Sequence, residues 1–436
     1  MDMSYLASSF YQLALLGCAI YAAIYLLFRR SIVSFSDPLN YNALIIAFYL
    51  AGALVLPSSH ILNLSYIYVL ILIALYIIAG AFFSHRRLPN RVPQLGVDRT
   101  TQLLFTAALT GLIVVNLIAN QVFGVMALFE GTQARAAYGS VISPSLYLLS
   151  PFLGIMVLLV FILTEVKPVR RLAGVGVCVS IVSTILGGSK SALFSILLIF
   201  LIADYVLNLK RNASTSSVEM LACTKQIKRI RRSGLTVAAA IAIVLPAYLS
   251  LIGAGSGGGG LEALAVRLFG GFDDLAIIGV KNIDITTIHG INISDFYFYP
   301  LIKKFAYTPE FQSSGSYLIY LLSGDYEFAT SGLNPNSSLA IELLISNGSI
   351  VISSILVTLV AAVVFRLRRS LIARPKLRMF DLVLWTLVVI GPFSVILDGT
   401  YFVITSYTLL GIYAALNISI NALSWLGPGR KLFRLL

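Results

Sequence analysis

The sequence predicts an all-α protein that crosses a membrane many times, and three observations lead to this class. Of the 436 residues, 58% are hydrophobic and only 11% are charged, whereas soluble domains carry about 25% charged residues. The mean hydropathy is +0.92. The apolar runs are about 20 residues long, as membrane helices require, rather than the roughly ten residues of a barrel strand.

Runs of low charge divide the chain into about eleven predicted spans, with more if the long outer loop contributes further membrane helices. The first run has no basic segment before it and no small-residue cleavage site, so we expect a membrane helix rather than a signal peptide. The predicted spans are residues 5–28, 40–57, 62–83, 102–128, 147–166, 172–187, 191–208, 235–253, 345–365, 380–397 and 401–425.

The basic residues predict the orientation of these spans. The sequence has 31 Lys and Arg residues, and all but six fall in every second connection or in the C-terminal tail. Because basic loops stay in the cytoplasm, we expect a periplasmic N-terminus and a cytoplasmic C-terminus. The net charge of +13 then reflects cytoplasmic loops and not a nucleic-acid-binding surface. The exceptions are Arg135, Lys190, Arg267, Lys281, Lys303 and Lys304.

One long polar segment, residues 254–337, interrupts the series of spans and is predicted to lie on the periplasmic side. A glycine-rich stretch, GAGSGGGG, opens it, and segments rich in aromatic and turn residues follow. Loops of this length are uncommon in compact proteins and are usually functional. The sequence therefore predicts three parts: an N-terminal helix bundle (1–253), the periplasmic loop (254–337), and C-terminal helices with a basic tail (338–436).

Three of the outer basic residues form a candidate site for an anion at the membrane surface. Arg135 and Arg267 offer planar forks of donors that suit phosphate groups. Lys190 follows two glycines, which let the backbone approach a ligand, where a helix N-terminus would favour an anion. The alternatives are a solvated loop arginine for Arg135 and a lysine that extends to the interface for Lys190. Together the three predict a diphosphate-binding site.

Two further residues are candidates for a catalytic base. His289 is the only histidine of the outer loop, and Glu342 stands in an apolar stretch, where an unpaired carboxylate is costly. For both, the alternative is a polar side chain without a catalytic role. No cluster of Cys, His or acidic residues has the spacing of a metal site, and no nucleotide-binding motif occurs. We therefore expect no metal ion and no cofactor.

Four short motifs resemble those of O-antigen polymerases of the Wzy type, which are related to the O-antigen ligases. SDPLNYNALIIAFYL resembles the start of an early span, and GGSKSALFSILLIF resembles a turn-and-span motif in which arginine usually stands at the position of Lys190. RLFGGFDDLAIIG resembles the arginine-led helix that opens the large periplasmic loop. NPNSSLAIELLISNGSIV resembles the pattern that closes this loop, with Asn336, Leu339, Glu342 and Gly348 in comparable positions.

This resemblance implies a glycosyltransferase of GT-C-like architecture in the inner membrane of a Gram-negative bacterium, acting in lipopolysaccharide biosynthesis. Its donor and acceptor would be oligosaccharide repeat units linked to undecaprenyl diphosphate, with a chain-length regulator protein as a further partner. By the same resemblance, Arg135 and Arg267 stabilise the diphosphate, Lys190 assists them, and Asn336 and Glu342 are the polar positions that close the loop. The candidates for sugar binding are Asn336, Tyr297 and Tyr299. The two tyrosines, in FYFYPL, would stack on sugar rings or anchor at the interface.

Two other functions stay open at this point. An O-antigen ligase would transfer the chain to lipid A core, but ligases usually carry a histidine where this chain has Asn336. A flippase or transporter of lipid-linked oligosaccharides would belong to a different class. It would be expected to show internal symmetry and charged residues deep within its spans, whereas the predicted spans here are nearly free of charge.

Overall fold

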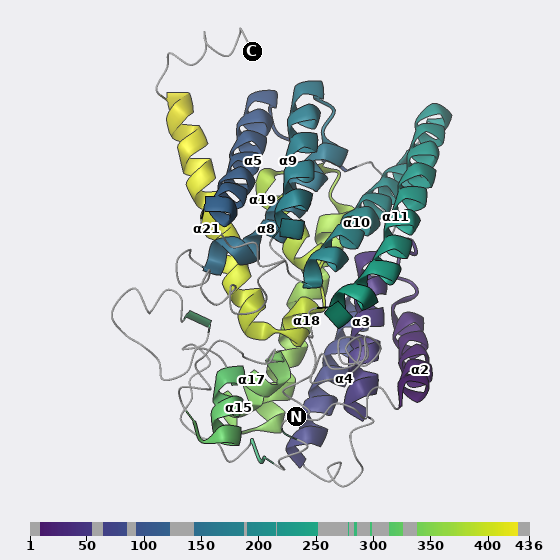
Figure 1. Ribbon diagram of the computed structural model, residues 1–436, viewed down its shortest axis with the longest axis vertical. Helices are drawn as coiled ribbons and strands as arrows, with labels where there is room; N and C mark the ends of the chain where they lie inside the picture. Colours follow the sequence, from purple (N-terminus) through teal and green to yellow (C-terminus); the bar gives the residue numbers. More distant parts are fainter. Residues whose placement is uncertain are drawn as a thin grey trace. The chain divides into compact units, whose positions relative to one another are not determined.

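In the residues that it describes, the computed structural model consists mainly of helices (Figure 1). The residues that it describes are 9–54, 64–84, 93–122, 144–186, 190–214, 216–251, 278, 283–285, 297–298, 314–325 and 338–425. Within these ranges the only strands are two residues long, and five helices are long and apolar enough to cross a membrane. These helices support a multi-pass membrane protein, while the total of about eleven spans stays a prediction. The five helices are α2 (Phe10–Phe28), α4 (Leu64–Ser84), α5 (Arg99–Val122), α18 (Ile350–Ala373) and α21 (Gly399–Trp425).

The chain folds into two compact units, each assembled from separate segments. Unit 1 consists of Met1–Arg87, Ala239–Ser370 and Val388–Ile404. Unit 2 consists of Leu88–Ala238, Leu371–Leu387 and Thr405–Leu436. The two units are defined by contacts within the chain, whereas the three parts predicted from the sequence are defined by position relative to the membrane; these three parts stay a prediction.

Unit 1 is organised around α2, α3 (Pro38–Leu54), α4 and α18. Helix α2 packs against α3 and α4. Phe28, Tyr76, Phe365 and Phe393 form an aromatic cluster in its core, with ring centroids 5.5–6.2 Å apart. Gly80 on α4 permits this packing, because a Cβ there would lie 2.5 Å from a ring carbon of Phe365. The unit also contains α15 (Ser314–Ser323), α17 (Leu339–Asn347) and α20 (Ser394–Leu397).

Unit 2 is organised around α5, α8 (Pro144–Leu163) and α9 (Lys167–Leu186), which pack against one another (Figure 1). Small residues allow the close approach that membrane helices favour. At Gly176 on α9, for example, a Cβ would lie 2.6 Å from the Thr110 hydroxyl of α5. Strand β1 (Gln94–Leu95) pairs in parallel with β2 (Lys376–Leu377) and so joins two connecting segments.

The apolar run that contains Lys190 forms two helices, as predicted. Helix α9 ends at Leu186, and α10 (Lys190–Ala213) begins at the lysine itself. Gly187 and Gly188, which separate the two helices in the sequence, lie outside the described residues. The bounds of α9 and α10 confirm the predicted break and place Lys190 at the first position of a helix.

The predicted span at 380–397 is not one continuous helix, because the structure breaks it. Helix α19 (Met379–Leu384) continues into a π-helical turn, η3 (Trp385–Val389), and α20 follows only after the pair Gly391–Pro392. Pro392 has no N–H to continue the hydrogen-bond ladder, and proline inside a helix kinks or breaks it, so a break here is favoured.

Side chains from α3 and α4 satisfy the carbonyls that this break leaves free. Asn42 donates to the carbonyl of Ile390 at 2.8 Å. Tyr76 donates to the carbonyl of Pro392 at 2.7 Å. Irregular backbone at membrane depth is tolerated only when its polar groups find such partners.

The basic run KQIKRIRR was expected in a connection, but the structure makes it part of a helix. Helix α11 (Ser217–Leu251) has 35 residues and includes the whole run. Lys, Arg, Gln and Ile sustain a helix without a break in this stretch. A helix of this length extends roughly 50 Å, well beyond a hydrocarbon core of about 30 Å, so its basic half belongs outside the core.

Candidate functional site

Glu342 lies on α17, a nine-residue helix whose start and end are set by its own sequence. The Ser338 hydroxyl caps the first turn by accepting from the N–H of Ile341 at 3.4 Å. Gly348 ends the helix in a left-handed conformation with φ 60°, and its N–H donates to the carbonyl of Leu344 at 2.8 Å. Serine at the start and glycine at the end are the preferred caps. The motif that resembles the polymerase pattern thus forms a defined helix.

The Glu342 carboxylate joins three segments of unit 1. The Tyr297 hydroxyl donates to Oε2 at 2.9 Å. At the start of α21, the backbone N–H of Thr400 donates to Oε1 at 3.1 Å, and the Thr400 hydroxyl donates to the same oxygen. The Glu342 side chain is fully buried. The structure therefore brings together Tyr297 and Glu342, two of the residues predicted for the site, and adds Thr400.

Gly399 makes this arrangement sterically possible. A Cβ at this position would collide with Oε2 of Glu342 and would lie 3.3 Å from the Cα of Leu339. A larger residue would displace the carboxylate from its hydrogen-bond partners. Nothing in the local sequence indicates this requirement, because it depends on a helix from a distant part of the chain.

Burial makes Glu342 a proton-exchanging group near neutral pH. Burial raises the pKa of its carboxyl to about 8; hydrogen bonds from Thr400 and Tyr297 lower it, and the nearby carboxylate of Asp398 raises it. Burial also raises the pKa of Asp398 to about 6, against a hydrogen bond from the N–H of Tyr401. Burial raises the pKa of Tyr297 too, so its phenol stays protonated. A carboxyl tuned in this way can take or give a proton under physiological conditions.

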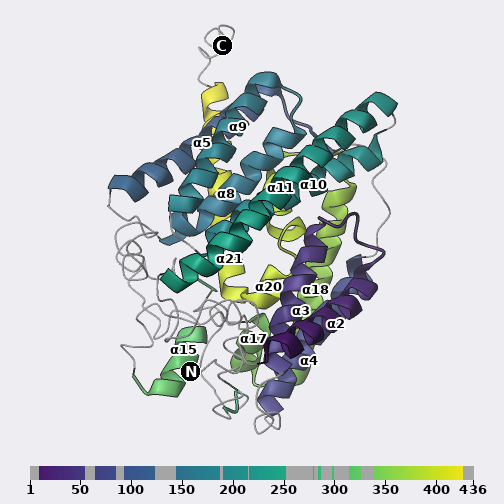
Figure 2. The same cartoon turned by 45° about the vertical axis from the view of Figure 1, so that its right-hand side comes forward.

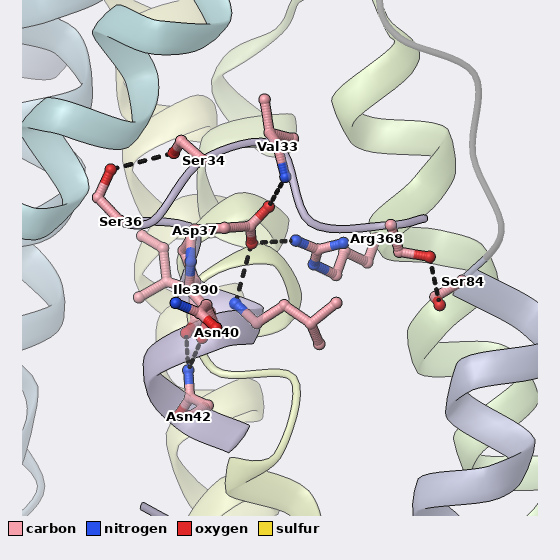
Figure 3. Close-up of polar contacts among 12 residues, drawn as sticks. Val33, Ser34, Ser36, Asp37, Asn40, Asn42, Ser84, Arg368 and Ile390 are labelled. Carbon is pink, nitrogen blue, oxygen red and sulfur yellow. Dashed lines mark hydrogen bonds and ion pairs between the residues drawn. The ribbon is translucent and has the colours of Figure 1, made fainter. Parts of the chain in front are cut away.

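A second buried polar group in unit 1 is an ion pair between Asp37 and Arg368 (Figure 3). Asp37 precedes Pro38, the first residue of α3, and its carboxylate accepts from the N–H groups of Leu39 and Val33, both at 2.9 Å. Arg368 on α18 donates to the same carboxylate. Both side chains are buried, with 0% and 1% of their surface exposed.

No sequence pattern indicates that Arg368 is buried, because it stands in a basic stretch expected in a cytoplasmic connection. The structure places it within α18, in contact with the SDPL motif. Proline at the first helical position and an acidic cap before it are a local helix-start signal, but the partner of that acid is 331 residues away. The pair fixes the start of α3 to the end of α18 and leaves no exposed carboxylate for a substrate.

The remaining predicted site residues are placed only in part. Lys190 begins α10 in unit 2, whereas Tyr297 and Glu342 belong to unit 1. Five of the predicted residues lie outside the described residues; they are Arg135, Arg267, His289, Asn336 and Tyr299. Within the described ranges, no group of three or more His, Cys, Asp or Glu side chains is placed to hold a metal ion.

Comparison with known proteins returned no matching family model, no matching curated protein and no matching solved structure. The candidate site therefore stands on its own geometry.

Proposed function

We propose that the protein is a glycosyltransferase that polymerises oligosaccharide repeat units linked to undecaprenyl diphosphate at the periplasmic face of the inner membrane. One observation carries the proposal. Glu342, within the motif that resembles the polymerase pattern, is a buried carboxyl with a pKa of about 8 that binds Tyr297 of the predicted periplasmic loop. This is the combination expected where a loop that contacts sugars is coupled to acid–base chemistry.

In the proposed reaction, a hydroxyl oxygen of one lipid-linked unit attacks the anomeric carbon of the growing chain. The bond between this carbon and the diphosphate oxygen breaks, and the lipid diphosphate leaves with the electron pair. Arg135 and Arg267, assisted by Lys190, would stabilise the charge that develops on the leaving group. The hydroxyl proton passes to a base or to the departing diphosphate, and no nucleotide is consumed because the donor is already activated.

Glu342 can serve this reaction in two distinguishable ways. As a base, it would accept the proton of a substrate hydroxyl that replaces the Tyr297 hydroxyl at Oε2. As a positioning residue, it would keep Tyr297 and the start of α21 in place. Glu342→Gln preserves the shape and most hydrogen bonds but cannot accept a proton, so it separates these roles.

Purified protein reconstituted with lipid-linked repeat units, with products sized on a gel, tests the proposal. A base role predicts that Glu342→Gln lowers the polymerisation rate by about 10²–10⁴-fold. A positioning role predicts near-normal rates for Glu342→Gln and a large loss for Glu342→Ala. Asp325→Asn, at an exposed acid of the same predicted loop, is the matched control and should behave as the wild type.

The predicted diphosphate site is tested in the same assay and in cells. Arg135→Ala and Arg267→Ala should abolish long polymer and leave single repeat units attached to lipid A core. Unchanged polymer length in both variants would show that the site is assigned wrongly. Loss of all surface glycan, single units included, would favour the ligase or flippase function instead.

A further inference from the structure

Unit 2 contains a pocket of about 650 Å³ that the proposed reaction does not use. It lies between the end of α8, the second half of α10 and the first half of α11; Figure 2 shows α10 and α11 next to each other. Its volume is within the range of ligand-binding pockets, about 300–1,000 Å³. Its apolar lining includes Leu158, Phe161, Phe200, Leu207 and Ile230.

Direct contacts between α10 and α11 hold the two helices that form these walls. Arg231 of α11 forms an ion pair with Asp204 of α10 at 2.8 Å. Gly234 of α11 lies directly against Phe200, since a Cβ there would be 3.2 Å from the Cβ of Phe200. The ion pair and the close approach at Gly234 therefore hold α11 beside α10 at the pocket.

Three cations line the pocket: Arg170 on α9 and Lys210 on α10 lie near each other at its polar end, and Arg229 is on α11. Arg170 donates to the carbonyl of Thr164 at 2.6 Å, and Lys210 donates to the carbonyl of Ile162 at 2.9 Å. Each of these two side chains has further donors that can face a ligand. Among the described residues, no carboxylate pairs with any of the three cations within 4.0 Å.

Two acidic residues also line this end, but both have neutral partners. Glu165 accepts from the Gln94 side chain at 3.0 Å, and Glu219 accepts from the Ser214 hydroxyl at 2.8 Å. Burial lowers the pKa of Lys210, and Glu165 and Glu219 only partly offset this effect. A bound anion would stabilise the charged ammonium, so the site gains by binding one.

We propose that this pocket binds an anionic phospholipid, with its phosphate at Arg170, Lys210 and Arg229 and an acyl chain between α10 and α11. The apolar walls favour a lipid over a free anion, because an anion alone would leave them in contact with water. The basic connections predict that this end faces the cytoplasm. Basic pockets between membrane helices on that side are suited to anionic lipid head groups. The site is separate from the proposed glycosyl transfer and does not depend on it.

Lipid binding to the full-length chain in detergent can be measured by native mass spectrometry with added phosphatidylglycerol or phosphatidylcholine. Arg229→Gln should weaken phosphatidylglycerol binding roughly fivefold, the equivalent of about 1 kcal/mol per basic residue near an anionic surface. Lys228→Gln removes the same charge from the neighbouring position of α11, outside the pocket lining. It should leave binding unchanged, and both side chains are exposed, so folding should not be affected.

Cys223, which lines the pocket, provides a second measurement. In a Cys18→Ser/Cys178→Ser background it is the only remaining cysteine of the three. Phosphatidylglycerol should slow its alkylation by N-ethylmaleimide, and phosphatidylcholine should not. Equal effects of the two lipids, or equal losses in Arg229→Gln and Lys228→Gln, would overturn the proposal. Protection by inorganic phosphate alone would show a free-anion site and would equally refute a lipid site.

Discussion

The Glu342 carboxylate accepts hydrogen bonds from Tyr297 and Thr400, which are 45 and 58 positions away in the chain. Because the side chain is buried, its charged form is disfavoured and its pKa rises to about 8. When the carboxyl is protonated, it can stay bonded to the same partners, and burying it costs less free energy because it carries no charge. The state of this one group therefore affects both the stability of unit 1 and the position of a residue from the predicted periplasmic loop.

The raised pKa of Glu342 predicts that stability falls as the pH rises. Its ordinary value is 4.5 and its folded value is about 8, so the folded state binds more protons between these values and loses stability across this range. Glu342→Gln, which resembles the protonated acid, should remove this decline above pH 6, whereas the raised pKa of Asp398, about 6, still contributes below it. Thermal unfolding in detergent at pH 5, 6.5 and 8 measures it. Parallel pH profiles for wild type and Glu342→Gln would contradict the assignment.

Gly399 and Gly411, both on α21, provide a matched pair of substitutions. Gly399→Ala should destabilise the protein by about 1–3 kcal/mol, as overpacking does, because the new Cβ collides with the Glu342 carboxylate. At Gly411 a Cβ would meet nothing within 4 Å. Gly411→Ala should therefore be neutral or stabilising by about 0.5–1 kcal/mol. Equal effects in a thermal unfolding assay would refute the close contact at Gly399.

At the scale of elements, single buried groups fix helices that are distant in sequence. The Asp37 carboxylate begins α3 and holds Arg368 of α18. Asn42 and Tyr76 likewise occupy the carbonyls of the broken segment between η3 and α20. Each of these two carbonyls thus has a hydrogen-bond partner within the protein.

The buried ion pair predicts strongly coupled substitutions. Arg368→Met leaves the Asp37 carboxylate buried without its cation and should cost about 3–5 kcal/mol. Adding Asp37→Asn, which retains the helix cap, should recover part of this loss because no charge then remains buried. A double-mutant cycle from thermal unfolding measures the coupling. Additive losses would show that the two side chains do not act as a pair.

At the scale of the whole chain, the contacts between connections agree with the predicted alternation of sides. Asp37 and Arg368 both lie near connections predicted to be cytoplasmic, and so do the paired strands β1 and β2. Tyr297, Glu342 and Thr400 all lie in segments predicted to be periplasmic. Within the described residues, these contacts therefore connect segments assigned to one side by the charge pattern.

The orientation predicts which cysteines can be labelled from outside. In a background without Cys18 and Cys178, the cysteine introduced by Asp325→Cys should react with a membrane-impermeant maleimide in cells with a permeabilised outer membrane. Cys223 should react only after the inner membrane is disrupted, because its segment is predicted to be cytoplasmic. The reverse pattern would invert the topology and remove the basis for the periplasmic site.

The sequence alone determined the class of the protein and the positions of most helices. Membrane helices satisfy their backbone hydrogen bonds internally, so each apolar run predicts its helix without knowledge of its neighbours. The break before Lys190 followed from length and glycines, and the caps of α17 are local serine and glycine signals. Glu342 was recognised as unusual because a carboxylate in an apolar stretch needs a partner.

Only the tertiary structure decided which residues bond to the buried polar side chains. The hydrogen bonds from Tyr297 and Thr400 to Glu342, the steric need for Gly399 and the pairing of Arg368 with Asp37 all join distant segments. Hydropathy predicts one continuous helix across Gly391–Pro392 and misses the break. The free energy of the break depends on Asn42 and Tyr76, because these side chains of other helices donate hydrogen bonds to the carbonyls that the break leaves free. Hydropathy and caps act along the chain, whereas burial of a polar group is a property of what surrounds it in space.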